Sequence, residues 1–303
     1  MRPLTRPGFT LVELLIVLIV GGAVATAATR LLQRQQRFYT RAGSLVMQRV
    51  SLRDATGIMP GEIRALSAVD GDVISFSDSS LEMRVTIGSA IACDTVAGGE
   101  ALHLAPDQLA GATPAVLASF ATVPNDGDVA LVYDTGTDDP SDDRWLAATI
   151  AGVSSGSDLC AASPLAALVG PGAASVRLLF VTGERLPPTV RPGAFVRVVR
   201  RVRYRFYRAS TGEWFLGHST WNGTSLGAVQ PVSGPFAPYR DDARGGFALR
   251  FFDAAGARLT SEMDPHGIAR IEISARGGTR EALSGGGNAP PDSQTVTIRL
   301  RNQ

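Results

Sequence analysis

The chain begins with an apolar segment long enough to cross a membrane. Residues 9–29, FTLVELLIVLIVGGAVATAAT, carry a single charged side chain, that of Glu13. About 20 apolar residues in a helix match the thickness of the hydrocarbon core of a bilayer. Arg2 and Arg6 precede the segment without any acidic residue, and basic residues favour the cytoplasmic side. The pattern predicts a span over about 9–29, with the rest of the chain across the membrane.

An apolar stripe with helical spacing continues beyond this segment. It consists of one row that recurs every seven positions and a second row beside it: Leu31, Phe38, Leu45 and Leu52, with Leu32, Tyr39 and Val46. The pattern ends near Asp54, where Gly57, Pro60 and Gly61 are stop signals. We therefore predict one long helix within 9–55. Its first half is apolar all round, and its amphipathic second half should pack against a globular domain.

From residue 56 to 303 the chain consists of short β-prone runs separated by clusters of Gly, Pro, Asp and Ser. The predicted strands are Val73–Phe76, Leu81–Ile87, Val129–Tyr133, Trp145–Ile150, Val176–Val181, Phe195–Tyr207, Glu213–Gly217, Phe247–Phe252, Ile268–Ser274 and Thr295–Arg301. This pattern predicts a β-rich head domain over 56–303. Together with the helix it makes an α+β chain.

A short motif bridges the basic leader and the apolar segment. Gly8-Phe9-Thr10-Leu11-Val12-Glu13 resembles the processing motif of type IV prepilins and of the pseudopilins of type II secretion. The resemblance implies a leader peptide over 1–8, which a prepilin peptidase removes by cutting between Gly8 and Phe9. It also implies N-methylation of Phe9, and a pilin fold in which the helix packs on a mostly antiparallel sheet.

The same resemblance gives Glu13 a role in assembly, as the partner of the N-terminal amine of a neighbouring subunit. A lone carboxylate in hydrocarbon is costly and becomes tolerable when a cation pairs with it. The alternative is a secretory signal peptide, for which Ala23-Val-Ala25 or Ala25-Thr-Ala27 would provide a cleavage site. Glu13 and the continuing helix argue against that alternative. Gly21-Gly22 is the place where the helix would unwind, if it unwinds.

Three segments in the second half of the chain resemble, in residue pattern and order, the PilW-type minor pilins and the J-type minor pseudopilins. These segments are RVRYRFYRASTGEWFLGHSTWNG, GFALRFFDAAGARL and TVTIRLRNQ. The resemblance implies a minor subunit without enzymatic activity that primes assembly at a pilus tip, or a J-type pseudopilin. Its partners would be the prepilin peptidase, other pilins or pseudopilins, and inner-membrane lipid before assembly. Its head would lie in the periplasm until the subunit enters the filament.

Composition limits the remaining chemistry. The formal net charge is +1, and all 29 basic residues are arginine, so chemistry that needs a lysine is excluded. The cysteines, Cys93 and Cys160, follow the apolar segment. In an exported head they should form a disulfide, whereas two buried free thiols are the alternative.

Two short strings imitate catalytic motifs. Gly152-Val-Ser154-Ser-Gly156 matches the GxSxG pattern of hydrolases, and Asp134-Thr-Gly136 matches the DTG of aspartic proteases. The first lacks the alternating strand–helix pattern that a nucleophile elbow needs, and the second would need a partner carboxylate from a dimer. We interpret both as loops or turns. A membrane-tethered hydrolase or binding domain remains the alternative from another class.

Charged clusters and histidines suggest further sites, each with a structural alternative. Asp138, Asp139, Asp142 and Asp143 offer the oxygen ligands that Ca²⁺ prefers, but their spacing is not that of an EF-hand and favours a solvated turn. The arginine-rich run 197–208 alternates with apolar residues. We expect its arginines to pair with acids on neighbouring strands, and we expect no nucleic-acid partner. The scattered His103, His218 and His266 are interpreted as structural, and no cofactor is expected.

Overall fold

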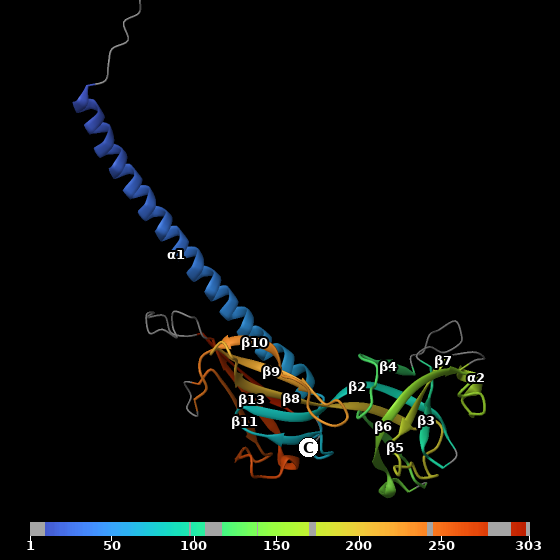
Figure 1. Ribbon diagram of the computed structural model, residues 1–303. Coiled ribbons are helices and arrows are strands. Elements are labelled where there is room, and N and C mark those ends of the chain that lie inside the picture. The colour runs from blue at the N-terminus through green and yellow to red at the C-terminus, as the bar shows by residue number, and fades with distance from the viewer. Residues whose placement is uncertain are drawn as a thin grey trace, which may run out of the picture.

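The computed structural model describes residues 10–96, 98–106, 117–137, 139–169, 174–240, 245–277 and 292–300, apart from the side chains of residues 41, 44, 168 and 169. Its first element is a single helix, α1 (Leu11–Ile63), which projects from a β-rich head (Figure 1). Every strand pairing in the head is antiparallel. The predicted α+β class and antiparallel sheet are confirmed.

Helix α1 ends later than the stop signals near Asp54 predict. It continues through Gly57, Pro60 and Gly61 to Ile63. Met59 and Ile63 are fully buried in the head, and burial of two large side chains outweighs the intrinsic helix preferences of glycine and proline. The helix also passes through Gly21-Gly22 without interruption.

The strands, in chain order, are β1 (Val73–Phe76), β2 (Ser80–Thr95), β3 (Ala101–Leu104), β4 (Ala118–Phe120), β5 (Val129–Asp134), β6 (Arg144–Ser157), β7 (Ala174–Phe180), β8 (Phe195–Arg208), β9 (Trp214–Thr220), β10 (Gln230–Phe236), β11 (Phe247–Phe252), β12 (Arg258–Leu259), β13 (Arg270–Arg276) and β14 (Ser293–Arg299). Short helical turns are η1 (Pro140–Asp142), α2 (Ala166–Val169) and η2 (Pro265–Gly267). Each predicted strand overlaps an observed one. Strands β3, β4, β10 and β12 were not predicted, because β3, β4 and β12 have at most four residues and β10 contains two prolines and a glycine.

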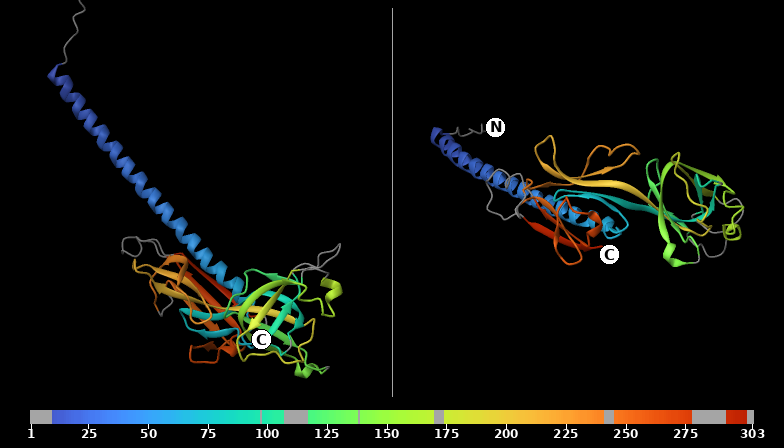
Figure 2. Two further views of the ribbon diagram at one scale, coloured as in Figure 1. Left: turned by 45° about the vertical axis from the view of Figure 1, so that its right-hand side comes forward. Right: turned by 90° about the horizontal axis from the view of Figure 1, so that it is seen from below.

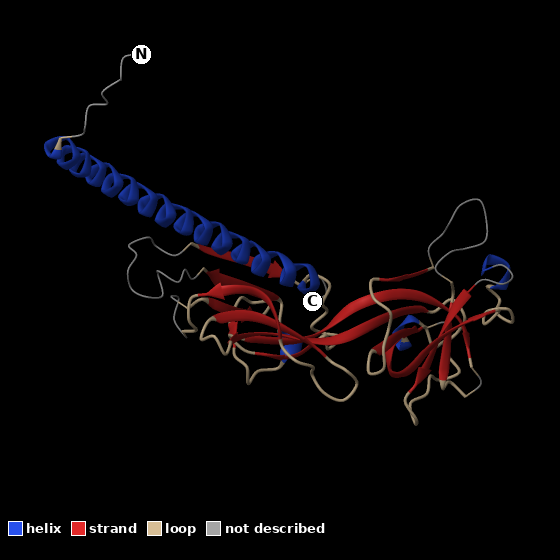
Figure 3. Ribbon diagram, turned by 45° about the horizontal axis from the view of Figure 1, so that its top comes forward, coloured by secondary structure: helices blue, strands red, loops and turns tan. Residues whose placement is uncertain are grey.

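The head has two lobes that share the long strands β2 and β8, which cross from one lobe to the other (Figure 3). A β-bulge interrupts their pairing between Thr86 and Gly88 of β2. Bulges bend and twist the strand that carries them. The bulge therefore lies where the two strands pass from the lobe beside α1 to the distal lobe.

The distal lobe is a closed antiparallel barrel. Pairings connect β2 to β3, β3 to β7, β7 to β6, β6 to β5, β5 to β8 and β8 back to β2. Closure leaves no free sheet edge in the ring. Buried apolar side chains fill its interior, among them Leu102, Ile150, Leu178 and Val196.

The lobe beside α1, here called the helix-side lobe, is built from two sheets (Figure 2). One has the order β1-β2-β8-β9-β10 and the other the order β12-β11-β13-β14. Aromatic side chains connect them, because Phe206 stacks on Phe247 at 5.6 Å and packs against Phe236 at 5.9 Å. The C-terminal part of α1 packs against β10, β13 and β14.

Candidate functional site: the projecting helix and its anchor

The N-terminal end of α1 is closed by a side-chain cap. The Thr10 hydroxyl accepts a hydrogen bond from the Glu13 backbone N–H at 3.3 Å, which satisfies one of the free donors at the helix start. The Glu13 side chain is exposed and has no partner among the described residues. Gly8 and Phe9 lie outside the described residues. A carboxylate in the first turn is thus left free on the helix surface.

The first half of α1 is not buried by any described residue of the head. Within the described residues, α1 is the single helix that is long and apolar enough to cross a membrane. None of its most apolar 18-residue segment is buried in the head. Burial in the head begins at Gln48 and continues with Ser51 and Leu52. At 1.5 Å per residue, the projecting part from Leu11 to Met47 is about 55 Å long. A bilayer core of about 30 Å leaves roughly 25 Å between membrane and head.

The apolar stripe of the second half does not pack on the head, contrary to our expectation. Leu31, Phe38 and Leu45 are 59%, 67% and 50% exposed, and only Leu52, at 1%, is buried. With 3.6 residues per turn, the residues that enter the head lie on another face, roughly 120° round the helix from the centre of the stripe. The stripe therefore enters the anchor only through Leu52, and Leu31, Phe38 and Leu45 are exposed before α1 reaches the head.

The anchor of α1 combines apolar burial with polar contacts to β10. Leu52, Met59 and Ile63 are at most 1% exposed. The Ser51 hydroxyl donates to the Gly234 carbonyl, and the Ser233 hydroxyl donates to the Ser51 carbonyl, both at 2.6 Å. These reciprocal bonds satisfy polar groups that burial would otherwise leave without partners.

Close packing extends the anchor to the end of β13. A Cβ atom added to Gly277 would lie 2.1 Å from Cγ of Gln48. Any larger residue at position 277 would force the Gln48 side chain to move. The helix is therefore fixed to the helix-side lobe at several points along its last turns.

A buried acidic group lies at the end of the anchor. Glu62 accepts a hydrogen bond from the Tyr204 hydroxyl, and its Oε2 atom is buried without a partner. Burial raises the pKa of Glu62 and, together with the neighbouring Glu62 carboxylate, raises the pKa of Tyr204. Burial also lowers the pKa of His218, whose ring lies 4.8 Å from that of Tyr204. The structure thus favours the neutral forms of these groups.

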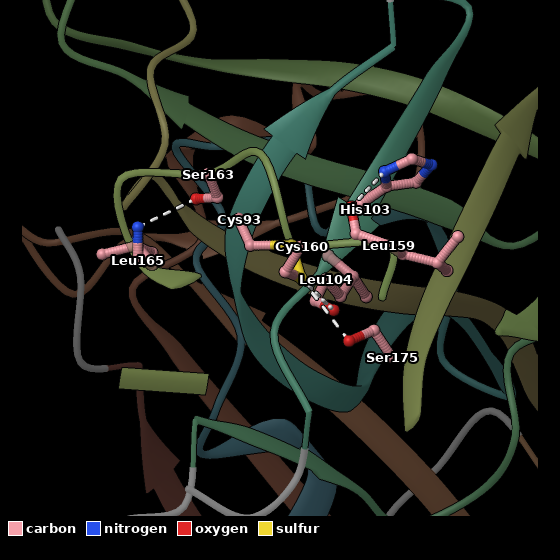
Figure 4. Close-up of a disulfide and its surroundings, with 8 residues drawn as sticks. All are labelled: Cys93, His103, Leu104, Leu159, Cys160, Ser163, Leu165 and Ser175. Atoms are coloured by element: carbon pink, nitrogen blue, oxygen red, sulfur yellow. Dashed lines mark hydrogen bonds between the residues drawn. A yellow bond between two sulfur atoms is a disulfide. The ribbon is translucent and has the colours of Figure 1, made fainter. Parts of the chain in front are cut away.

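Cys93 of β2 and Cys160 are joined by a disulfide in the distal barrel, with Cα atoms 5.5 Å apart (Figure 4). It attaches the segment after β6 to the outside of β2. Nδ1 of His103 lies 3.0 Å from the Leu159 carbonyl, beside the disulfide. Since a carbonyl only accepts, this nitrogen carries the proton. Around the bridge lies a small apolar cluster that includes Ala105 and Leu165.

Asp139, Asp142 and Asp143 accept hydrogen bonds from groups close to them in sequence. Oδ2 of Asp142 accepts from the Thr137 N–H and hydroxyl, at 3.1 and 2.9 Å. Asp139 accepts from the Ser141 N–H, which lowers the pKa of Asp139. Asp143 accepts from the Tyr133 hydroxyl, and Asp138 lies outside the described residues. Within the described part of the chain, no three His, Cys, Asp or Glu side chains are grouped as metal ligands.

The strings that imitate catalytic motifs have structural roles. The interpretation of residues 152–156 as a loop is wrong, because they belong to strand β6 and pair with β7. Ser154 lies opposite Arg177, so no strand-to-helix turn presents it as a nucleophile. The Asp134 carboxylate is 2% exposed and accepts from the Thr189 hydroxyl at 2.8 Å and from the Gly136 N–H at 3.0 Å. Asp134 therefore stabilises a turn. His266 pairs with Asp264 in an exposed turn.

The arginine run of β8 pairs with acids, as expected from its alternation. Glu82 of β2 is 1% exposed and contacts both Arg201 and Arg203. Arg197 pairs with the fully buried Asp72 at 2.7 Å, and Arg200 with the buried Asp128 at 2.7 Å. Of the remaining arginines of the run, Arg205 lies over the Tyr207 ring and Arg208 donates to the Gly212 carbonyl. The acids that take part are 72 to 125 residues away in sequence, which is why the sequence predicted an acidic partner without identifying the residue.

The comparisons with known proteins bear on the first segment of the chain. Residues 5–29 match the family model described as the prokaryotic N-terminal methylation motif. This range contains the Gly8-Phe9 bond, Glu13 and the whole of the predicted span over about 9–29. The match is consistent with a type IV prepilin-like protein and covers the N-terminal segment alone. No curated protein and no solved structure matches the chain.

Proposed function

We propose that the chain is a minor subunit of a type IV pilus, inserted in the inner membrane as a prepilin with its head outside the cytoplasm. A prepilin peptidase would cut between Gly8 and Phe9, and Phe9 would become the methylated N-terminus. The observation that carries the proposal is the match over residues 5–29, continued by a helix that projects about 55 Å from the head. The head contributes no arranged catalytic group among the described residues.

Assembly would proceed through α1. Glu13 is free on the helix surface, and pairing with the N-terminal amine of a neighbour would offset the cost of a carboxylate in hydrocarbon. The role in a priming or tip complex rests on the resemblance to PilW-type subunits. A J-type pseudopilin of type II secretion would use the same helix. A gene deletion distinguishes the two, because the first predicts loss of surface pili and the second loss of secreted enzymes.

Processing is tested by co-expression with a prepilin peptidase. Mass spectrometry should find a chain that lacks its first eight residues and starts at Phe9. Gly8→Leu should block the cut, and Glu13→Ala should leave it intact while filament incorporation falls. A mature chain that starts near Ala25 or Ala27 would instead identify a secretory signal peptide and end the proposal. Normal incorporation of the Glu13→Ala chain would refute the role of the ion pair.

A further inference from the structure

The two lobes of the head are joined by a ribbon of two strands. Strands β2 and β8 pair with each other through the junction, from Ser80 of β2 in the helix-side lobe to Ile91 of β2 in the distal barrel (Figure 3). On its other edge β8 changes neighbours at the junction, since β5 pairs with its residues 196–199 and β9 with its residues 202–208. Two-stranded ribbons twist more strongly than wide sheets, and the bulge of β2 adds a bend. The backbone alone therefore gives the junction little resistance to bending.

A first ion pair connects the barrel part of β8 back to the helix-side lobe. Arg197 lies in the stretch of β8 that pairs with β5, whereas Asp72 lies just before β1. Nη2 of Arg197 donates to Oδ2 of Asp72 at 2.7 Å, and its Nε donates to the Thr86 hydroxyl, beside the bulge, at 2.6 Å. The Asp72 side chain is fully buried and also accepts from the Ser67 N–H. The charged contact is therefore shielded from water, and further hydrogen bonds position both partners.

A second ion pair runs in the opposite direction. Arg200 lies just beyond the stretch of β8 that pairs with β5, on the side of the helix-side lobe, and Asp128 lies just before β5 in the barrel. Nε and Nη2 of Arg200 donate to Oδ1 and Oδ2 of Asp128 at 2.8 and 2.7 Å. A bidentate pair of this kind fixes the relative orientation of its partners as well as their distance. Asp128 is 2% exposed and also accepts from the Asn125 N–H, so the two ion pairs cross between the lobes.

Loops of the two lobes also touch directly. Gly127 lies beside Asp128 in the barrel, and Gly223 follows β9 in the helix-side lobe. A Cβ atom added to Gly127 would lie 2.2 Å from the Gly223 Cα atom, so backbone meets backbone at this point. Nη2 of Arg200 donates to the Val123 carbonyl of the same barrel loop at 3.1 Å. Contacts at several separate points restrain a rotation that one contact alone would allow.

We propose that the two crossed ion pairs, Arg197–Asp72 and Arg200–Asp128, hold the junction at one angle, so that the distal barrel and the helix-side lobe turn as one rigid body. Because α1 is fixed to the helix-side lobe at several points, the barrel then keeps a constant orientation relative to the helix. The inference goes beyond the proposed function and does not depend on it, since it concerns contacts within the head. A subunit of this kind presents its barrel in one direction wherever α1 is held.

The test measures the distance between the lobes in the full-length chain in detergent micelles. Ser261 of the helix-side lobe and Ala147 of the barrel, both exposed, are replaced by cysteine and spin-labelled while the native disulfide stays oxidised. Pulsed electron paramagnetic resonance then gives the distribution of distances between the two labels. With the junction held at one angle, the labelled wild-type chain should give a single narrow distribution.

The test variant removes both partners of each ion pair, so that no lone buried charge is left to unfold the head. It carries four substitutions: Asp72→Asn, Arg197→Gln, Asp128→Asn and Arg200→Gln. Its distance distribution should be broader than that of the wild-type chain, or centred at another distance. A folded fourfold variant, verified by circular dichroism, that keeps the wild-type distribution would overturn the proposal.

A matched control removes another buried carboxylate and an arginine of β8, both within the helix-side lobe. This control, Glu82→Gln with Arg203→Gln, should keep the wild-type distribution, and a broadening equal to that of the fourfold variant would contradict the proposal. If the fourfold variant does not fold, two half variants decide, each with one of the ion pairs removed. Broadening beyond the control in either half variant supports the proposal, and wild-type distributions in both overturn it.

Discussion

Reduction of the Cys93–Cys160 disulfide should destabilise the distal barrel more than the helix-side lobe. The bridge connects residues separated by 67 positions in sequence, and the chain between them contains the whole of β3, β4, β5 and β6. Both cysteines are at most 1% exposed. Reduction therefore releases the segment around Cys160 from strand β2 and changes no side-chain volume substantially.

The magnitude follows from the loop that the bridge closes. In the chain-entropy model, a loop of this length loses enough freedom in the unfolded state to stabilise the fold by about 4 kcal/mol. The attachment of Leu159 to His103 and the apolar cluster beside the bridge keep the segment near its place after reduction. The barrel should therefore remain folded when reduced, but with a free energy of unfolding lower by about that amount.

Tryptophan fluorescence separates the two lobes during urea denaturation. Trp145 lies in the barrel strand β6, and Trp214 lies in β9 of the helix-side lobe. Single-tryptophan variants that keep one or the other should show a lower midpoint for the Trp145 transition under reducing conditions, and a smaller change for Trp214. An unchanged Trp145 midpoint, with reduction verified by mass, would refute the reasoning. Equal shifts of both transitions would show that the shared strands couple the lobes into one unfolding unit.

Three further predictions concern the anchor and the junction of the lobes. Met59→Ala should lower the free energy of unfolding by about 2–5 kcal/mol, because the side chain is fully buried, as urea denaturation would measure. Burial raises the pKa of Glu62 in the folded protein. The folded state therefore loses stability relative to the unfolded state as the pH rises from the pKa of this carboxyl in the unfolded chain through its higher pKa in the folded one. Glu62→Gln should remove that loss and be more stable than wild type at neutral pH in a pH series of thermal melts. Asp72→Asn should cost about 3–5 kcal/mol in urea denaturation, because it leaves the Arg197 guanidinium without its anion.

Matched variants control these measurements. Phe38→Ala, at a position 67% exposed, should change the free energy of unfolding by less than about 0.5 kcal/mol. Asp70→Asn removes an exposed carboxylate near Asp72 and should be nearly neutral. A Met59→Ala cost no larger than that of Phe38→Ala would contradict the anchor described above. Equal stability of Glu62→Gln and wild type at every pH would show that the carboxyl stays hydrated.

The positions of most strands could be predicted because they depend on local pattern. The segment Val202–Phe206 alternates in sequence, and its Val202, Tyr204 and Phe206 side chains are buried in the structure. Strand β1 and strand β11 have the predicted bounds. Strand β6 extends beyond the predicted Ile150 to Ser157, because pairing with β7 supports residues whose small side chains have little strand preference.

The amino-acid sequence alone determined the features that arise from neighbours along the chain. A bilayer-length apolar run, Glu13 near its start and the helical spacing beyond it are one-dimensional properties, since helix geometry repeats every few residues. The same holds for the Gly8-Phe9 motif, which a family model also matches.

Only the tertiary structure decided where α1 ends, how the barrel closes and which face of the helix stays free. Each depends on contacts between distant segments: Ser51 with Ser233, β8 with β2, Glu82 with Arg201. Burial in the head outweighed the stop signals at Gly57 and Pro60, because removing Met59 and Ile63 from water stabilises more than a local preference costs. The apolar stripe of α1 was visible in the sequence, but only the structure shows that Leu52 alone of its first row is buried in the head.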